Sequence, residues 1–336
     1  MATSTDGKVT TVQLNDGLRL PLVGIGTSSV VAAKPSGHGS DPTHDAIKTA
    51  VRAGYRFFDT ATLYGNEQAV GSALRECIQD GLVARDELTV CTKVWNTRHK
   101  RDSVLEACRE SLARLGLQYI DLYLIHWPTA YAENGNDPIN PTDEKTGKLA
   151  YSDTHFTETW LGMEDCKERG LVRSIGLSNF NQLMCDEILN MPRLRYKPTV
   201  NQVECHPYLN QQRLLDYSRQ VGIVLNAYCP LGSPGACASP DQPALLQDSF
   251  VRQLAQRHGK TPAQIVIRFQ VQRGVAAIPK SIKSERIKEN IDVFDFELTQ
   301  PEMDQLMGIN RNLRYCLNTA GHYIDDHPLY PFHADY

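Results

Sequence analysis

Four side chains that can do acid–base chemistry lie at the ends of neighbouring apolar runs in this 336-residue chain. Asp59 directly follows the run 55–58, Tyr64 comes five positions later, and Lys93 and His126 lie at the ends of the next two runs. A tyrosine titrates near pH 10 and is a poor acid at neutrality. A buried ammonium beside it would lower its pKa, and that ammonium would itself need a carboxylate partner.

Asp59, Lys93 and Tyr64 form such a set, and His126 adds a donor that can orient a carbonyl oxygen. The predicted chemistry is protonation of an oxyanion by the phenol while hydride arrives at carbon. No metal is required, because His126 is followed by Trp and Pro and has no second His, Cys or acid at ligand spacing. Asp59 alone would prove little, since an Asp after a strand is usually a turn former or a helix cap.

The elements around these residues alternate between short apolar runs and amphipathic stretches. The expected strands are residues 21–27, 55–58, 88–95, 119–128, 172–180, 198–207, 223–232 and 275–281. The expected helices include 45–53, 67–79, one capped by Asp102, 154–168, 182–189, 210–220, 249–258 and 264–272, then one through Ile287 and Ile291 and an added one capped by 299–302. Residues 261–264 read as a capping box.

Eight strand–helix units favour a closed (β/α)8 barrel of the TIM type over an open sheet. Residues 9–14 and 18–23 are expected to form an N-terminal hairpin after a short flexible start. Two extra helices and long loops at the C-terminal face complete the fold, and no linker divides residues 1–336, which we expect to form a single domain.

Composition excludes several classes of protein. The 35 basic and 39 acidic residues are nearly balanced, with a formal net charge of −4 and no basic block, which argues against nucleic-acid binding. No apolar run approaches a membrane span, and the polar start lacks a signal-peptide core, so a cytoplasmic protein is expected. Nine cysteines without a CxxC pair predict reduced thiols and no zinc site.

The motifs together resemble the aldo-keto reductase superfamily over about residues 9–336. They are GYRFFDTATLYGNE, TKVW, LIHWP, IGLSNFN, NQVECHPY and IPKS followed by ERIKEN. The resemblance implies an NADPH-dependent enzyme that reduces aldehydes and ketones, acts as a monomer and uses Asp59, Tyr64, Lys93 and His126 as a catalytic tetrad. Tyr64 would be the proton donor.

The resemblance also implies a binding site for NADP(H). The residues implied are Gly26, Thr27, Ser178, Asn179, Gln202, Tyr228, Leu231, Ser233, Lys280, Ser281, Arg286, Glu289 and Asn290. Ser178, Asn179 and Gln202 would hold the carboxamide and Tyr228 would stack on the nicotinamide ring. Lys280, Ser281 and Arg286 would take the adenosine 2′-phosphate, because a dianion favours cations and a bidentate Arg, which selects NADP over NAD.

The implied substrate pocket departs from the family pattern. It would be lined by Ser28, Trp95, Trp127, Leu313 and Cys316, and the loops 29–41 and 235–242 would border it. Ser28 and Leu313 stand where many relatives carry Trp, and the second loop has no aromatic residue. We therefore expect a wider pocket that favours larger or aliphatic carbonyls, such as steroid or terpenoid ketones or lipid aldehydes.

Other interpretations of these residues stay open. Ser178, Asn179 and Gln202 can equally be hydrogen-bonded within the protein, Trp127 can be core, and Cys316 can be an inert thiol. The alternative function is a catalytically silent, cofactor-binding barrel that acts as a structural or channel-associated subunit. An intact set of Asp59, Tyr64, Lys93 and His126 argues against that alternative.

Overall fold

The computed structural model describes residues 3–6, 9–28, 41–234, 243–317 and 324–334. The loop predictions for residues 29–41 and 235–242 therefore lie outside the described residues, apart from Asp41.

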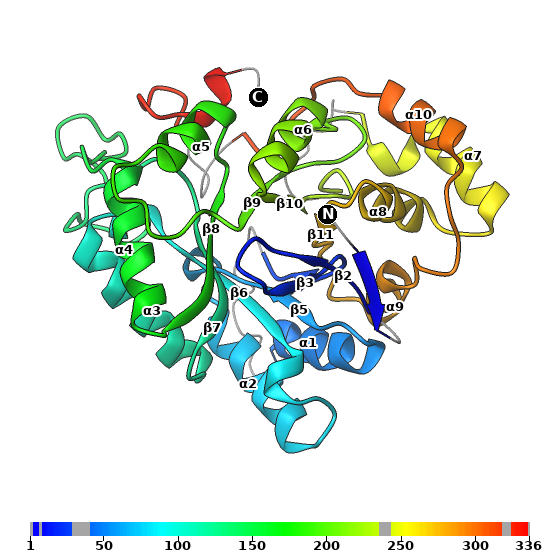
Figure 1. The fold of residues 1–336 in the computed structure, drawn as a ribbon, viewed down its shortest axis with the longest axis horizontal. Coiled ribbons are helices and arrows are strands. Elements are labelled where there is room, and N and C mark those ends of the chain that lie inside the picture. The colour runs from blue at the N-terminus through cyan, green and yellow to red at the C-terminus, as the bar shows by residue number, and fades with distance from the viewer. Residues whose placement is uncertain (1–2, 7–8, 29–40, 235–242, 318–323, 335–336) are drawn as a thin grey trace.

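An eight-stranded parallel sheet forms the centre of the molecule (Figure 1). Its strands are β4 (Ile25–Gly26), β5 (Phe57–Asp59), β6 (Thr89–Val94), β7 (Ile120–Ile125), β8 (Val172–Ser178), β9 (Val200–Glu204), β10 (Val224–Tyr228) and β11 (Ala276–Ala277). They pair in sequence order from β4 to β11. Parallel bridges of Val23 with Ala277 and of Gly26 with Lys280 join the two ends, so the sheet closes on itself. The predicted (β/α)8 barrel is confirmed.

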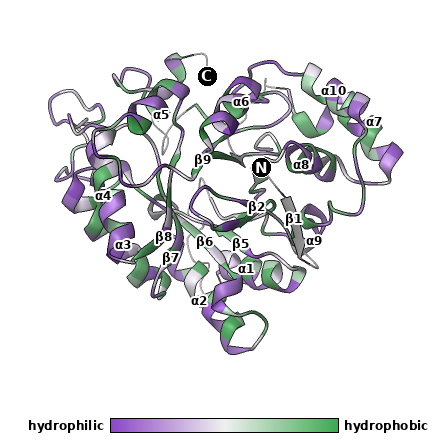
Figure 2. Ribbon diagram, viewed as in Figure 1, coloured by the Kyte–Doolittle hydropathy of each residue, from purple (hydrophilic) through white to green (hydrophobic). Residues whose placement is uncertain are grey.

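The barrel strands read as continuous apolar runs because both of their faces are buried. Every residue of β6 and β7 is buried, including Lys93. At the closure, a Cβ on Gly26 would lie 2.9 Å from the carbonyl oxygen of Ile278, so only glycine fits there. Figure 2 shows the helices with mixed hydrophobic and hydrophilic residues around this core.

Ten α-helices are described, and they surround the sheet (Figure 1). They are α1 (Pro42–Ala53), α2 (Glu67–Gln79), α3 (Arg101–Leu115), α4 (Phe156–Glu168), α5 (Gln182–Leu189), α6 (Gln212–Val221), α7 (Ser249–His258), α8 (Pro262–Gln272), α9 (Ser284–Ile291) and α10 (Gln300–Gly308). Eight of them alternate with the strands. Helices α7 and α10 are the two additional ones.

The helix starts follow local capping chemistry, with one correction. The capping box before α8 is present, with Thr261 and Gln264 each accepting from the other's backbone N–H at 3.3 and 2.9 Å. The prediction that Asp102 caps α3 was wrong, because α3 begins at Arg101 and Lys100 occupies the cap position. Asp102 lies in the first turn, where its negative charge complements the helix dipole.

A small antiparallel sheet precedes the barrel. Its strands are β1 (Thr3–Asp6), β2 (Val9–Gln13) and β3 (Arg19–Pro21), and β2 and β3 form the predicted hairpin. The expectation of a flexible start was wrong for β1, whose backbone pairs with β2. The Asn15 side chain at the hairpin turn donates to the carbonyl of Pro198 at 2.7 Å, shortly before β9. The hairpin therefore lies at the amino-terminal end of the strands, opposite the predicted site.

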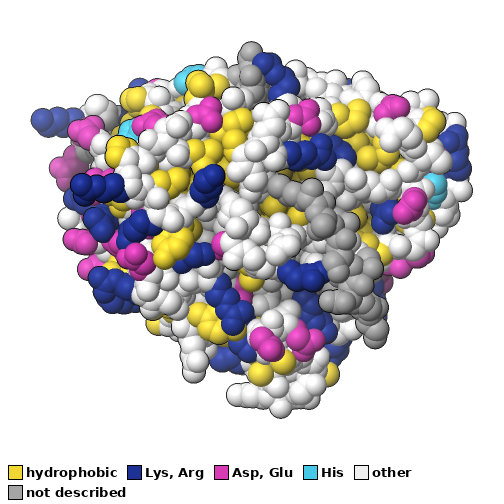
Figure 3. Space-filling model, in the orientation of Figure 1, with side chains coloured by type: hydrophobic (Ala, Val, Ile, Leu, Met, Phe, Trp, Pro, Cys, Tyr) yellow, Lys and Arg dark blue, Asp and Glu magenta, His cyan; other side chains and the backbone are white. Residues whose placement is uncertain are grey.

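The surface carries interspersed charges of both signs on the face that Figure 3 shows. Among the described residues, no helix is long and apolar enough to cross a membrane. No group of three or more His, Cys, Asp or Glu that could hold a metal ion occurs in that same part of the chain.

Candidate active site

Asp59 and Lys93 form an ion pair inside the barrel. The Nζ atom of Lys93 lies 2.7 Å from Oδ1 of Asp59 and 2.8 Å from the carbonyl oxygen of Thr60. The Lys93 and Asp59 side chains are 0% and 2% exposed. Burial alone would lower the pKa of Lys93. The charge and hydrogen bond of Asp59, together with the neighbouring Tyr64 and Cys91, outweigh burial and raise that pKa, so the ammonium stays charged.

Tyr64 lies next to this pair, on a single turn of 3-10 helix (Thr62–Tyr64) that follows β5. The Lys93 ammonium lies 5.0 Å from the centre of its ring. Burial raises the pKa of Tyr64 to about 12, although the charge of Lys93 acts to lower it. The predicted lowering by the ammonium is thus present, but burial outweighs it, and the net shift of the Tyr64 pKa is upward, contrary to expectation. Tyr64 remains a protonated phenol at neutral pH.

His126 completes the group from the residue after β7. Its ring packs edge-on to Tyr64 with centroids 5.6 Å apart, and to Trp95 at 5.3 Å. Burial and the charge of Lys93 hold the pKa of His126 well below its ordinary value, so the imidazole is neutral. Its Nδ1 atom is buried and has no hydrogen-bond partner among the described residues. The structure therefore brings all four predicted catalytic residues together.

Gln202 and Thr27, predicted to bind the cofactor, hydrogen-bond Asp59. The Gln202 side chain donates to Oδ2 of Asp59 at 2.8 Å, and the Thr27 hydroxyl donates to the Asp59 carbonyl at 2.9 Å. Asn66 links this network, because it donates to the Thr27 carbonyl at 2.9 Å and accepts from the Thr60 hydroxyl at 2.7 Å. Both oxygens of the Asp59 carboxylate are thus held in place.

A second polar network lies at the ends of β8 and β10. Tyr228 donates its hydroxyl to Oδ1 of Asn179 at 2.8 Å, and Asn179 donates to the His126 carbonyl at 3.0 Å and to Oγ of Ser178 at 3.3 Å. Asn179 adopts a φ of 63°, which directs the chain sharply out of β8. Ser178, Asn179 and Tyr228 are therefore close to one another and to His126, as predicted.

The predicted phosphate-binding residues lie at the closure of the barrel, where the chain after β11 meets β4. Lys280 pairs with Gly26 at the end of β11, and Lys280 and Arg286 are both exposed. Within the described ranges, no ion pair involves either cation. Of the remaining predicted cofactor residues, Glu289 is exposed, Asn290 is buried, and Ser281, Leu231 and Ser233 are partly buried.

The predicted pocket residues divide between two hydrophobic clusters. Trp95 and Trp127 are 1% and 5% exposed and pack with Tyr131. Leu313 and Cys316 are partly buried and pack against a different cluster that includes Tyr208 and Tyr315. Ser28 is exposed at the end of the described segment 9–28.

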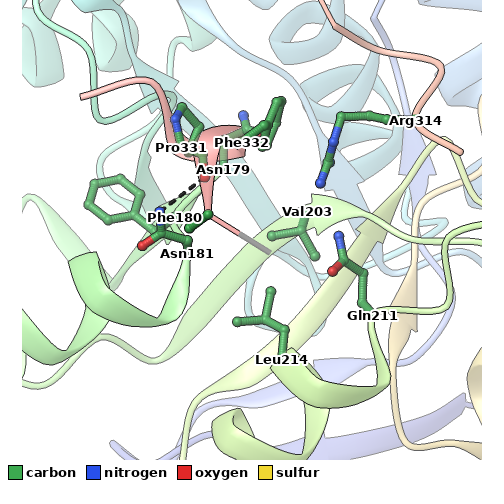
Figure 4. A pocket seen from close by; sticks show the side chains of 10 residues that line it. Asn179, Phe180, Asn181, Val203, Gln211, Leu214, Arg314, Pro331 and Phe332 are labelled. Carbon is green, nitrogen blue, oxygen red and sulfur yellow. Dashed lines mark hydrogen bonds between the residues drawn. The ribbon is translucent and has the colours of Figure 1, made fainter. Parts of the chain in front are cut away.

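A small cavity of about 20 Å³ lies beside this region (Figure 4). It lies between the end of β8 and the C-terminal segment, where Asn181 donates to the carbonyl of Pro331 at 3.0 Å. Its volume suits a single water molecule. A larger cavity of about 530 Å³ is lined by Thr10, Leu22 and the start of β10, so it belongs to the opposite end of the barrel.

Sequence reasoning gave no role to three residues that position the site. Thr60 accepts from Lys93 through its backbone carbonyl, a contact that leaves no signal in the residue type. Asn66 lies within the GYRFFDTATLYGNE motif, and this placement was the one sequence signal that could have pointed to its role in the site. Glu204 is fully buried at the end of β9 and accepts from the backbone N–H groups of Tyr315 and Cys316 at 2.7 and 3.0 Å.

Comparison with known proteins identifies this arrangement. Residues 23–311 match the model of the aldo/keto reductase family. The chain belongs to that family. Mouse aldo-keto reductase family 1 member D1 is 45% identical over 330 residues, which cover 97% of each chain.

Two further relatives are similar over their whole length. Mouse estradiol 17 beta-dehydrogenase 5 is 44% identical, with 98% of this chain and 100% of that protein aligned. Bovine aldo-keto reductase family 1 member A1 is 44% identical, with 97% of this chain and 98% of that protein aligned. As an aldo/keto reductase, the chain is an oxidoreductase that acts on carbonyl and alcohol groups.

Proposed function

We propose that this aldo/keto reductase reduces carbonyl compounds with NADPH and that Tyr64 donates the proton to the oxygen. The observation that carries the proposal is the fully buried Lys93 ammonium, held by Asp59 and lying 5.0 Å from the centre of the Tyr64 ring. A buried charge is costly unless it is paired. A protein that used the barrel only as a scaffold would gain nothing by keeping this charge.

The four residues would divide the work as follows. Tyr64 keeps its proton at neutral pH and can give it to the oxygen of a carbonyl group. The positive charge of Lys93 stabilises the phenolate that remains, and Asp59 keeps Lys93 charged. Neutral His126 can donate a hydrogen bond to the same oxygen and so orient the substrate.

The residues present fit NADP(H). Lys280 and Arg286 are exposed cations without an ion pair among the described residues, which suits a phosphate dianion. Ser178, Asn179 and Tyr228 supply hydroxyl and amide groups next to His126, which suits a carboxamide and its ring. Bound NADPH would supply the hydride. Gln202, which donates to Asp59, would then act chiefly by fixing that carboxylate.

We propose larger or aliphatic carbonyls as substrates, including steroid-sized ketones. The support is that Leu313 and Ser28 replace bulkier residues expected from the family pattern. The name of estradiol 17 beta-dehydrogenase 5, a relative at 44% identity, is consistent with a ligand of that size. We also propose that the protein acts in the cytoplasm as a monomer, with the whole of residues 1–336 forming one domain.

The test is consumption of NADPH, followed by absorbance, with a panel of aldehydes and ketones. Turnover is expected with the native chain, and Tyr64→Phe should lose at least about 100-fold in kcat, the usual contribution of a positioned general acid. Tyr119→Phe removes the same hydroxyl just before β7, at the other end of the barrel, and should keep the native rate. Equal kcat values for the native chain and Tyr64→Phe would show that Tyr64 is not the general acid.

A further inference from the structure

Two cysteine thiols meet at the mouth of the barrel. Sγ of Cys229, the residue after β10, lies 3.3 Å from Sγ of Cys316 in the segment that follows α10. Eight cysteines are described, none of them in a disulfide, and six of them are buried. Cys229 and Cys316 are the two partly exposed ones in the described part of the chain, so a small solute can reach them.

Both thiols are carried by backbone that the structure holds firmly. The buried carboxylate of Glu204 accepts from the backbone N–H of Cys316 at 3.0 Å and lies 3.0 Å from Nε2 of His206. The carbonyl of Cys229 accepts from Gly232 N–H at 2.9 Å in a tight turn, where Cys229 has a φ of 47°. The contact between the sulfurs therefore joins two anchored segments.

We propose that Cys229 and Cys316 form a reversible disulfide when the protein meets a peroxide. One thiol, as its thiolate, attacks a peroxide oxygen, which breaks the O–O bond and gives a sulfenic acid and one water. The second thiol attacks that sulfur and releases a second water. The two thiols lose two electrons and two protons, and hydrogen peroxide is reduced to two waters.

The geometry requires only a small movement. A disulfide has a sulfur–sulfur distance of about 2.05 Å, so the two atoms must approach by little more than about 1 Å. Rotation of the two side chains and a small shift of the segment that carries Cys316 can supply this approach, since Cys229 is continuous with a barrel strand. The bond would thus tie the segment that carries Leu313 to the strand that carries Tyr228.

A second thiol pair in the molecule provides a built-in comparison. Cys108 on α3 and Cys166 on α4 are both fully buried, and the Cys166 thiol donates to the carbonyl of Val104 on α3 at 4.0 Å. The neighbouring Cys166 and burial raise the pKa of Cys108 above the ordinary thiol value. We call Cys108 and Cys166 the inner pair, and Cys229 and Cys316 the outer pair. Because thiolate character and exposure control oxidation, the inner pair should stay reduced under conditions that oxidise the outer pair.

The outer pair is close enough to the candidate active site to affect it. Cys229 lies next to Tyr228, whose hydroxyl binds Asn179, and its thiol is among the groups that influence the pKa of Tyr64. Locking the C-terminal segment should therefore change how the pocket accepts bulky substrates.

The experiment treats the full-length protein with hydrogen peroxide, blocks free thiols with an alkylating agent and maps disulfides by mass spectrometry without reduction. Cys237 lies outside the described residues, so native protein and Cys237→Ser are run side by side. We expect a peptide that joins Cys229 to Cys316 in both proteins. Dithiothreitol should remove it, and it should be missing from Cys229→Ser and Cys316→Ser.

The same digest reports on the inner pair, and Cys108→Ser should leave the cross-link unchanged. A cross-link from either outer cysteine to Cys237, a Cys108–Cys166 cross-link of equal yield, or oxidation of Cys229 and Cys316 without a bond between them would overturn the proposal. The mass measurement decides this whether or not the protein reduces carbonyls.

Activity supplies the second readout. Oxidation of the Cys237→Ser protein should lower kcat/KM for a bulky ketone on the order of tenfold relative to a compact aldehyde, since displacements of about 1 Å at a site have large effects. Reduction should restore it. The same loss in Cys229→Ser would show that the disulfide is not its cause.

Discussion

Nζ of Lys93 lies 2.7 Å from Oδ1 of Asp59, and neither side chain has more than 2% of its surface exposed. This ion pair joins two neighbouring strands, β5 and β6, in the interior of the barrel. It therefore serves two purposes: it satisfies a charge that the fold has buried, and it places that charge next to Tyr64.

Asp59→Asn should destabilise the protein strongly, because it leaves the Lys93 ammonium buried without a counter-charge. Removing one partner of a buried pair costs about 3–5 kcal/mol of unfolding free energy. Urea unfolding followed by circular dichroism measures this. Glu106→Gln is the matched control, because Glu106 pairs with Arg98 on the surface at 3.3 Å. It should cost less than about 1 kcal/mol, and equal losses in both variants would contradict the assignment.

Stability should fall as the pH drops below about 6.5, before the carboxylates titrate. Burial lowers the pKa of His99 to about 3 and holds that of His126 well below its ordinary value. The unfolded chain takes up protons near pH 6.5 while the folded chain does not, so acid favours unfolding. Glu302, whose pKa is lowered to about 2, loses its contribution only below about pH 4.5.

His99→Leu isolates one of these groups. Between pH 6.5 and pH 5, His99 should account for about 1.6 kcal/mol of lost unfolding free energy, since the unfolded histidine is already half protonated at pH 6.5. Urea unfolding at the two pH values should show a smaller loss in His99→Leu than in the native chain. An identical loss would mean that His99 is protonated in the folded protein.

Much of the site could be predicted because its residues end neighbouring strands. Asp59, Lys93 and His126 meet for the reason that parallel strands bring their carboxyl ends to one mouth. Residue type and order were sufficient for that inference. The direction of the Tyr64 pKa shift could not be predicted in the same way, because it depends on how far burial outweighs the charge of Lys93.

Side-chain partners across the barrel also could not be predicted from the sequence. Gln202 was expected to hold the cofactor, and nothing in the sequence indicated that its amide also donates to Asp59, 143 positions away. Nor did the sequence indicate that Trp95 and Leu313, both expected to line the pocket, pack in two different hydrophobic clusters. The sequence also overestimated the strands at the barrel closure: β4 and β11 have two residues each, where residues 21–27 and 275–281 were expected.

Arg286→Met should raise the KM for NADPH far more than that for NADH. A charge-assisted hydrogen bond to a phosphate is worth about 1.5–3 kcal/mol, which corresponds to a rise of roughly 10- to 100-fold. Lys288 lies exposed on the same helix, α9, and Lys288→Met serves as the control for loss of a positive charge. If Arg286→Met changed both constants alike, Arg286 would not read the 2′-phosphate.

Leu313→Trp should narrow the pocket and shift the choice of substrate. Leu313 is partly buried, and its backbone N–H donates to the carbonyl of Tyr208 at 3.0 Å, so a larger side chain has to extend away from that anchor. We expect kcat/KM for a bulky ketone to fall on the order of tenfold, a size typical of steric discrimination, while a compact aromatic aldehyde is little affected. Leu317→Trp adds the same bulk to the same segment at a position that is 39% exposed, and it should change neither substrate. A native enzyme that already prefers the compact aldehyde strongly, or a Leu313→Trp variant that loses both substrates equally, would show that Leu313 does not set the width of the pocket.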